Sequence, residues 1–364
     1  MPFNFASAGL RQPAPRLKTA GCAVAAAVGL LGVASCSGNV DAPADAPSAA
    51  EQSLPGAGVT VVPAYATLEE RFQTEVVNIG LEQLGYEIEA LREVDYAALF
   101  LDMANGNITY TPAHWSINQK ALFENSGGDA ALEKAGAIVD DSLQGYMIDR
   151  ATAEAYGITS LEQLADPKIA GLFDSDGDGK ANLVGCDAGW LCSTIIDHHI
   201  DAYGLKDTVQ QEQGKYVTLV ADVVARHQQG QPVLYYTYTP FWLHNILSDG
   251  EEVVWLEVPF TSLPEGQGDD LSEEQTTVGG RNLGFAVQDQ MIVANQDFMD
   301  ENPAASQLFE RVNISIEDVN AQNQLIRDGE DSPQQIRAHA EAWVEENQAL
   351  FDGWVQEVLA DTQG

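Results

Sequence analysis

The sequence predicts an α/β protein built from two lobes. Its 364 residues, of which 45% are hydrophobic, are enough to bury two apolar cores. Thirty-two glycines and fifteen prolines are typical of a fold in which many turns join helices and strands. The first folded segment reads as strand, helix and strand, an order that favours a mainly parallel sheet covered by helices.

The N-terminus predicts export and lipid attachment. Basic residues up to Lys18 precede an apolar run, residues 20–34, that is too short to span a bilayer comfortably. Val33-Ala34-Ser35-Cys36 resembles a bacterial lipobox, so we expect residues 1–35 to be removed and Cys36 to carry a lipid. Residues 36–57, rich in Ala, Pro, Asp, Ser and Gly, predict a flexible tether. These features predict a periplasmic or other extracytoplasmic location; a plain signal peptide and a membrane-spanning anchor are the alternatives.

Strand and helix patterns alternate after the tether. A strand is expected at 58–63, and Thr67 and Glu70 form a capping box before a helix that Gly85 closes. The further predicted strands are 86–88, 108–111, 137–139, 144–148, 232–238 and 253–258, and the further predicted helices are 96–105, 160–173, 193–203 and 216–228. Pro167 interrupts the helix at 160–173. A strand-like run within 279–295 leads into a helical C-terminal section.

Three aromatic residues stand where ligands collect in α/β proteins. Trp115 and Tyr238 follow predicted strands, and the carboxyl ends of strands form the usual binding edge of a sheet. Trp190 lies in a short loop between Cys186 and Cys192. Three ring faces that meet at one point would form a box for a quaternary ammonium group. Packing in the core is the alternative for each ring.

The cysteines divide between processing and folding. Cys22 lies in the signal and Cys36 at its end, which leaves Cys186 and Cys192 in the mature protein. A single pair in an exported protein predicts a disulfide, and two cysteines are too few for a structural metal site.

Composition and missing motifs narrow the function. The formal charge is −38, from 55 acidic and 17 basic residues. Because a phosphate backbone is bound by a basic surface, nucleic-acid binding is excluded as a leading hypothesis. The chain has no Gly-x-Ser-x-Gly elbow, no HExxH sequence and no complete phosphate loop. We therefore expect no catalytic residues and no cofactor, although an enzyme that uses clustered carboxylates stays an alternative.

The stretch 174–179 resembles the first half of a calcium loop. Asp174, Asp176 and Asp178 have the spacing of calcium ligands, but the twelfth position is Gly185 rather than a glutamate. The prediction is no metal site and a plain acidic turn, with weak calcium binding as the alternative.

Longer segments of the chain resemble one known family. They include LPGAGVTVVPAYATLEERFQTEVV, QGYMIDRATAEAYGI, LADPKIAGLFDSDGDGKANLVGCDAGWLC, VLYYTYTPFW and FDGWVQEVL, and together they extend from about Pro55 to Trp354. The chain is similar to the glycine betaine/proline betaine-binding proteins of bacterial ABC uptake systems. The resemblance implies a two-lobed periplasmic-binding-protein fold of type II, with lobe one at 58–142 and 289–364 and lobe two at 143–288.

The resemblance also implies a ligand site and partners. The family's aromatic box falls on Trp115, Trp190 and Tyr238, and its backbone donors to the betaine carboxylate fall on Leu191 and Cys192. Two residues depart from the family pattern: Tyr238 replaces the usual tryptophan, and Gln119 replaces a histidine that helps to hold the carboxylate. The implied protein is a monomer that captures a betaine between its lobes and delivers it to a membrane permease with its ATPase subunit. Choline, carnitine or another cationic or zwitterionic solute is the alternative ligand.

Overall fold

The computed structural model describes residues 53–362, and these residues form a three-stranded and a five-stranded sheet with separate apolar cores, together with three two-stranded sheets. The predicted signal peptide, Cys36 and most of the tether lie outside the described residues. The structure differs from the prediction at the end of the tether, because Gly56 is buried and its N–H donates to the Leu84 carbonyl at 2.9 Å. Within residues 53–362, no helix has the length and apolarity needed to cross a bilayer.

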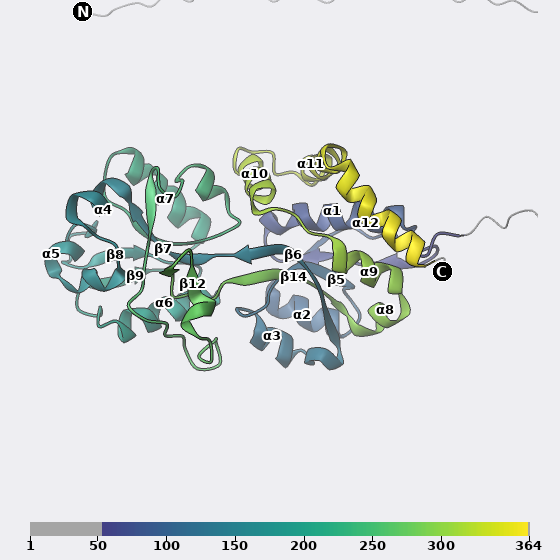
Figure 1. Ribbon diagram of the computed structural model, residues 1–364, viewed down its shortest axis with the longest axis horizontal. Helices are drawn as coiled ribbons and strands as arrows, with labels where there is room; N and C mark the ends of the chain where they lie inside the picture. Colours follow the sequence, from purple (N-terminus) through teal and green to yellow (C-terminus); the bar gives the residue numbers. More distant parts are fainter. Residues whose placement is uncertain (1–52, 363–364) are drawn as a thin grey trace, which may run out of the picture. The chain divides into compact units, whose positions relative to one another are not determined.

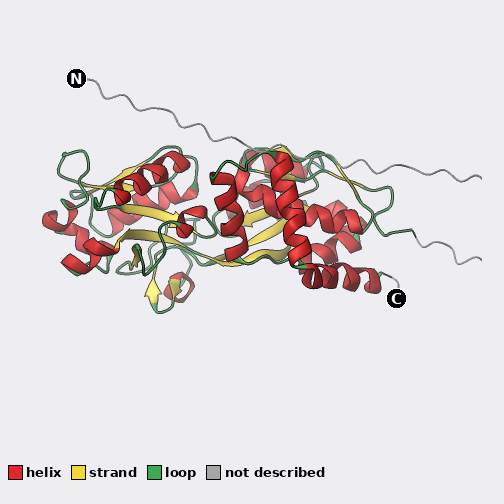
Figure 2. Cartoon of the chain, turned by 90° about the horizontal axis from the view of Figure 1, so that it is seen from above, coloured by secondary structure: helices red, strands yellow, loops and turns green. Residues whose placement is uncertain are grey.

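The first sheet has three antiparallel strands in the order β5-β14-β6, and we call the part built on it lobe one. Its middle strand, β14 (Gln288–Asn295), presents alternate residues to opposite faces. Ile292 and Ala294 pack with the helices of one face, whereas Val293 packs with α2 on the other. Figure 2 shows the helices that flank these strands.

Lobe one combines an N-terminal and a C-terminal part of the chain. Its strands are β1 (Thr60–Val61), β2 (Ala64–Tyr65), β3 (Glu87–Ile88), β4 (Arg92–Glu93), β5 (Tyr110–Trp115), β6 (Leu132–Ser142) and β14. Its helices are η1 (Leu68–Glu70), α1 (Arg71–Gln83), α2 (Tyr96–Ala104), α3 (Lys120–Asn125), η2 (Gly128–Ala130), α8 (Gln296–Glu301), α9 (Pro303–Arg311), α10 (Ile316–Arg327), α11 (Pro333–Glu346) and α12 (Gln348–Asp361).

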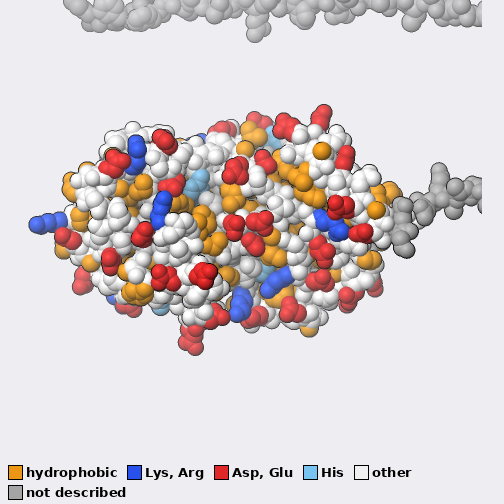
Figure 3. Space-filling view, viewed as in Figure 1, with side chains coloured by type: hydrophobic (Ala, Val, Ile, Leu, Met, Phe, Trp, Pro, Cys, Tyr) orange, Lys and Arg blue, Asp and Glu red, His pale blue; other side chains and the backbone are white. Residues whose placement is uncertain are grey.

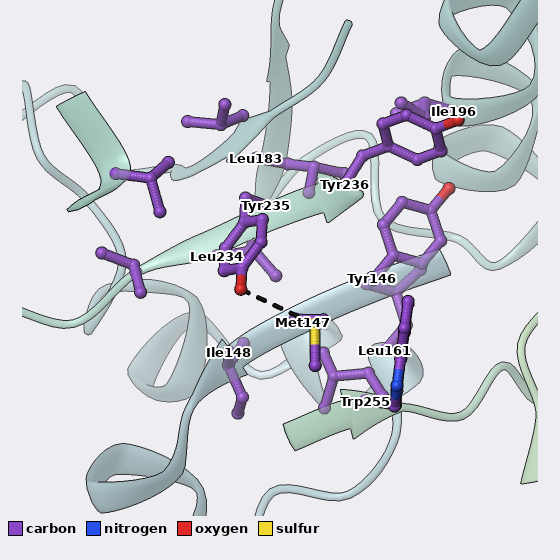
Figure 4. Close-up of a cluster of buried hydrophobic side chains, with 14 of the residues drawn as sticks. Tyr146, Met147, Ile148, Leu161, Leu183, Ile196, Leu234, Tyr235, Tyr236 and Trp255 are labelled. Carbon is purple, nitrogen blue, oxygen red and sulfur yellow. Dashed lines mark hydrogen bonds between the residues drawn. The ribbon is translucent and has the colours of Figure 1, made fainter. Parts of the chain in front are cut away.

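The second sheet has five strands in the order β11-β7-β10-β8-β9, and we call the part built on it lobe two. Its core includes Tyr146, Met147 and Tyr235, which lie on the adjacent strands β7 and β10 (Figure 4). The Tyr235 hydroxyl donates to the Met147 sulfur at 3.6 Å, so this buried polar group has a partner.

Lobe two occupies the middle of the chain. Its strands are β7 (Gln144–Asp149), β8 (Ala181–Val184), β9 (Val209–Glu212), β10 (Leu234–Tyr238), β11 (Val253–Leu256), β12 (Thr277–Val278) and β13 (Arg281–Asn282). Its helices are α4 (Arg150–Tyr156), η3 (Leu161–Ala165), α5 (Pro167–Ala170), α6 (Leu191–Ala202), α7 (Tyr216–Gln228), η4 (Trp242–Asn245) and η5 (Glu273–Thr276).

Strand direction differs from the sequence prediction, whereas the break in one helix agrees with it. The β8, β9 and β10 strands are parallel, but β7 runs antiparallel to β10 and β11, and the three-stranded sheet of lobe one is antiparallel throughout. The strands of the β-α-β start, β1 and β3, are parallel as expected, but the prediction of a mainly parallel sheet was wrong for the two larger sheets. The helix expected at 160–173 is interrupted at Pro167 as predicted: it forms two short pieces, η3 and α5, because Pro167 starts a new helix after the Asp166 cap.

Two chain crossings and several contacts join the lobes. β6 ends at Ser142 in lobe one and β7 begins at Gln144 in lobe two, while β14 brings the chain back (Figure 1). From α10 of lobe one, the Asn320 carbonyl accepts a hydrogen bond from the Asn245 side chain at 2.9 Å. The Arg327 guanidinium lies 4.6 Å from the centre of the Trp242 ring.

The surface carries the acidic excess of the sequence. Asp and Glu side chains are scattered over the face seen in Figure 3, where Lys and Arg are few. This distribution is that of a solvated acidic surface, which keeps a protein soluble.

Candidate functional site

The three predicted aromatic residues meet where the lobes face each other. Trp115 is the last residue of β5 in lobe one, and Tyr238 is the last residue of β10 in lobe two. Their ring centres are 5.7 Å apart with planes at 88°. The Trp190 ring lies 6.1 Å from Tyr238 at 70°. Rings that are far apart in the sequence therefore form one steeply angled cluster.

Two further aromatic residues support the lobe-two side of this cluster. The Tyr216 ring lies 5.7 Å from Trp190 and 5.5 Å from Tyr238, and the Phe241 ring lies 5.0 Å from Tyr238. Tyr216 is 1% exposed, and its hydroxyl donates to the Tyr236 carbonyl at 3.1 Å. Because both rings behind Trp190 and Tyr238 are buried, this wall has little freedom to rearrange.

The loop that carries Trp190 is fixed at two places. Cys186 and Cys192 form the predicted disulfide, and both are buried. Asp187 accepts a hydrogen bond from the Tyr216 backbone N–H at 2.9 Å and lies 3.5 Å from the Lys215 ammonium. A carboxylate at the N-terminus of α7 is stabilised by the helix dipole, so the loop is tied to that helix.

The start of α6 offers backbone donors next to Trp190. Trp190 is the N-cap residue, and no side chain caps this helix. Among the described residues, the backbone N–H groups of Leu191 and Cys192 have no hydrogen-bond acceptor. Free N–H groups and the helix dipole make such a terminus favourable for an anion.

A cavity of about 450 Å³ opens beside these residues. Trp190, Tyr238 and Tyr216 line it from lobe two, and Glu69 and Arg327 border it from lobe one. Its other lining residues are Thr67, Leu68, Glu93, Asp187, Lys215, Val217, Phe241, Trp242 and Ile326. Residues of both lobes therefore enclose it.

Gln119 lies behind Trp115 rather than on the cavity wall. It is 6% exposed, and its backbone N–H donates to the Trp115 carbonyl at 2.8 Å. Its side-chain oxygen accepts a hydrogen bond from the Trp115 N–H at 3.2 Å. Neither Trp115 nor Gln119 borders the cavity. The Trp115 ring joins the aromatic cluster through Tyr238, and Gln119 contacts the Trp115 backbone.

An acidic group beside the cluster was not predicted from the sequence. The buried Glu70 carboxylate accepts hydrogen bonds from the Tyr96 hydroxyl and from the N–H groups of Ala66 and Thr67. Burial raises the pKa of Glu70 to about 7, although these hydrogen bonds oppose the shift. Burial also raises the pKa of Glu69, which lines the cavity. The sequence indicated Glu70 only as part of a capping box, which it does form.

The Asp174, Asp176 and Asp178 carboxylates lie together, with oxygen atoms within 4.8 Å of one another. Asp174 accepts hydrogen bonds from the N–H groups of Gly177 and Gly179 at 2.6 and 2.9 Å. The turn's own backbone therefore uses this carboxylate, as an acidic turn requires.

Comparison with known proteins gives one consistent family. The family described as "Substrate binding domain of ABC-type glycine betaine transport system" matches residues 59–346. The "Glycine betaine-binding periplasmic protein OusX" of Dickeya dadantii (strain 3937) is 45% identical over 312 residues, which cover 85% of this chain and 93% of that protein. The "Glycine betaine/proline betaine-binding periplasmic protein" of Escherichia coli (strain K12) is 44% identical, with 84% and 92% covered.

Solved structures share the fold at low sequence identity. The glycine betaine, L-proline-binding protein ProX from Borrelia burgdorferi has a TM-score of 0.61 at 17% identity, covering 81% of this chain and 96% of its own. Lactococcal OpuAC, in its closed-liganded conformation with glycine betaine, has a TM-score of 0.59 at 15% identity, covering 82% and 99%. These likenesses confirm the two-lobed α/β fold expected from the sequence.

Proposed function

The chain belongs to the family of substrate-binding domains of ABC-type glycine betaine transport systems, and from this premise we propose how it holds its ligand. It captures glycine betaine or proline betaine for uptake. The trimethylated or dimethylated nitrogen lies against Trp115, Trp190 and Tyr238, and the carboxylate lies at the N-terminus of α6.

The observation that carries this proposal is the angle between the rings. Two perpendicular ring faces with centres 5.7 Å apart can share a point about 4 Å from each, which is within cation–π range. Trp190 and Tyr238, with centres 6.1 Å apart at 70°, meet the same condition. A methylated nitrogen held between such faces is attracted to each ring and needs no opposite charge. Each contact contributes ~0.5–2 kcal/mol, depending on how well water is excluded.

The carboxylate end uses donors that the fold already leaves free. The N–H groups of Leu191 and Cys192 have no acceptor among the described residues, and Trp190 immediately precedes them. One loop thus supplies an aromatic face and two N–H donors, which matches a zwitterion whose opposite charges are close together. Gln119 does not border the cavity, and we propose that closure of the lobes brings its neutral amide donor to the carboxylate.

Two lobes around one ligand imply that binding and closure are linked. Trp115 and Gln119 belong to lobe one, whereas Trp190, Tyr238 and the N-terminus of α6 belong to lobe two. A ligand that contacts both sides favours the closed arrangement over the open one. The closed form is the shape that a membrane permease and its ATPase recognise, and the protein releases its ligand unchanged, without turnover.

Isothermal calorimetry of the wild-type protein with glycine betaine tests this function. We expect one site per chain and saturable binding, with no chemical change of the ligand by mass spectrometry. Absence of binding to both glycine betaine and proline betaine would refute the proposal.

Choline is a second candidate ligand, favoured by one observation. Glu69, Glu93 and Asp187 line the cavity and outnumber its two cationic residues, Lys215 and Arg327. A net negative lining suits a cation that lacks a carboxylate. Competition calorimetry decides between the two: choline that displaces glycine betaine at equal concentration would favour this second ligand.

The relatives are periplasmic proteins, which supports a periplasmic location for this protein. We further propose that Cys36 carries a lipid that holds a monomer at the membrane. Mass spectrometry of the mature N-terminus would show a diacylated or triacylated cysteine, and a Cys36→Ala variant would be released from the membrane fraction. An unmodified N-terminus upstream or downstream of Cys36 would refute the anchor.

A further inference from the structure

The orientation of the Gln119 side chain can be read from its neighbours. A backbone N–H can only donate, so the side-chain atom 3.2 Å from the Trp115 nitrogen must be the oxygen, Oε1. The amide nitrogen, Nε2, therefore points away from Trp115's backbone. With Oε1 turned inward, Gln119 is a donor toward the rest of its surroundings.

A second group supports the same orientation. The His114 Nδ1 atom lies 3.2 Å from Gln119 Oε1. Because Oε1 carries no proton, a hydrogen bond between them requires the proton on Nδ1. His114 is fully buried, and its ring packs between Phe100 at 5.2 Å and Phe123 at 5.7 Å. Those rings leave the imidazole little freedom to turn away.

The surroundings of His114 keep it neutral. Burial lowers its pKa to about 4, although the hydrogen bond with Gln119 opposes the shift and the positive charge of Lys134 adds to it. The Lys134 ammonium lies 4.1 Å from the centre of the Phe123 ring, against which His114 packs. The His114 Nε2 atom is buried and has no hydrogen-bond partner among the described residues. A neutral ring with its single proton on Nδ1 fits all of these contacts.

The amide end of Gln119 is left available by these contacts. Among the described residues, the side-chain hydrogen bonds of Gln119 all reach Oε1. An amide NH₂ group has two hydrogens, so both remain for a ligand. A ligand that brings a hydrogen-bond acceptor is therefore favoured at this position.

We propose that His114 is a positioning residue of the ligand site: with the Trp115 N–H it holds Gln119 Oε1, so that the Gln119 amide hydrogens face the ligand carboxylate. This inference rests on the proposed function. It assigns His114 a role in recognising the carboxylate end of a zwitterion, although His114 touches no ligand. Without the His114 donor, the amide is free to turn and present its oxygen, which repels a carboxylate.

A double-mutant cycle separates positioning from packing. Glycine betaine affinity is measured by calorimetry for the wild type, His114→Phe, Gln119→Ala and the double variant. His114→Phe keeps an aromatic ring in the pocket between Phe100 and Phe123 but removes the donor. We expect it to weaken binding about five- to tenfold, and less than about twofold when Gln119 is already alanine.

Two additions make the result specific. His114→Asn can still donate to Gln119 Oε1 and is expected to restore affinity to within about threefold of the wild type. Nitrogen-15 NMR of the imidazole is expected to show a proton on Nδ1 alone between about pH 5.5 and 8. Thermal unfolding of each variant confirms that it is folded.

The outcomes distinguish this inference from the function it rests on. A full five- to tenfold loss in the Gln119→Ala background, no loss in either background, or a proton on Nε2 would overturn the positioning role while leaving betaine binding intact. A wild-type protein that binds no betaine would overturn the proposed function, and this inference with it.

Discussion

The two sides of the proposed ligand site are built in different ways. The lobe-two side is aromatic: Trp190 and Tyr238 pack on buried Tyr216, and the disulfide fixes the loop that carries Trp190. The lobe-one side has one aromatic residue, Trp115, and is otherwise polar. Gln119 hydrogen-bonds with His114 and with the Trp115 N–H. In the proposed function, the lobe-two side supplies aromatic contact area for the ammonium, and the lobe-one side supplies a hydrogen bond that orients the carboxylate.

This difference predicts unequal energetics. Ring faces in a dry site each contribute up to ~2 kcal/mol to the binding of a cation, whereas a neutral hydrogen bond contributes ~0.5–1.5 kcal/mol. Substitutions in lobe two should therefore lower affinity for any methylated ammonium. Substitutions in lobe one should lower affinity less and act mainly on the carboxylate end.

The largest effect is expected from Trp190→Ala. Loss of the indole removes one wall of the box, and glycine betaine affinity should fall about 30-fold or more, since ~2 kcal/mol of cation–π attraction is lost. Calorimetry measures the change, with Phe260→Ala as the control because Phe260 is an exposed aromatic residue of lobe two away from the cavity. Equal affinity of the Trp190→Ala variant and the wild type would remove the box from the mechanism.

Reduction of the disulfide is expected to act on stability first. Opening the short loop between Cys186 and Cys192 raises the entropy of the unfolded chain, which lowers the free energy of unfolding by about 2 kcal/mol. Urea unfolding with and without a reductant measures this, and Cys186→Ser provides the same loss without a reductant. Affinity should fall by a smaller factor because Asp187 still ties the loop to α7. Unchanged stability on verified reduction would show that packing alone holds this side of the site.

The lobe-two side was the easier one to predict from the sequence, for a physical reason. Trp190 between two cysteines and Tyr238 at the end of an apolar strand are local patterns, and the structure places both as expected. Tyr216 was missed because a tyrosine at the start of an amphipathic helix has the same pattern as a core residue. Only the fold shows which two rings it supports.

The lobe-one side depends on contacts that no local pattern reveals. Gln288 is 170 residues from Asn118, yet the Gln288 side chain donates a hydrogen bond to the Asn118 side chain where β14 returns from lobe two. The direction of β14 was missed for the same reason, because it is set by where the chain returns from lobe two. His114 was overlooked because a buried histidine in a strand carries no signal of its partner.

Asn118→Ala tests the coupling between the lobe-one side and the chain crossing. The Asn118 side chain donates to Gln144 at 3.0 Å and accepts from Gln288 at 2.9 Å, while Gln288 also accepts from the Ile117 N–H. These bonds hold the segment between Trp115 and Gln119 against β7 and β14.

We expect Asn118→Ala to weaken betaine binding about fivefold, since the segment that presents Trp115 loses two hydrogen bonds. Asn107→Ala is the matched control, because Asn107 is an exposed asparagine of lobe one away from the cavity. Calorimetry gives the affinities. A loss as large as that of Trp190→Ala would contradict the unequal division of energy between the two sides.

The smallest effect on betaine affinity is expected from a change in pH, because few residues on the lobe-one side change charge near neutral pH. Gln119 does not titrate, and His114, whose pKa is lowered to about 4 chiefly by burial, stays neutral above about pH 5. Glu70, whose pKa is raised to about 7 by burial, is the nearby group that changes charge in the physiological range. Its charged form repels the ligand's carboxylate and attracts the ligand's ammonium, so loss of that charge as the pH falls through 7 changes the affinity by the difference between two opposing effects.

That change in affinity should be small, because a betaine is a zwitterion with no net charge. The attraction of Glu70 for the ammonium offsets much of its repulsion of the carboxylate, and Tyr96, Ala66 and Thr67 already donate to Glu70. Calorimetry between pH 5.5 and 8 should show affinities within about threefold of one another. Tenfold tightening toward pH 5.5 that disappears in Glu70→Gln would instead make Glu70 part of the carboxylate end. The lobe-one side would then act through charge as well as through hydrogen-bond direction.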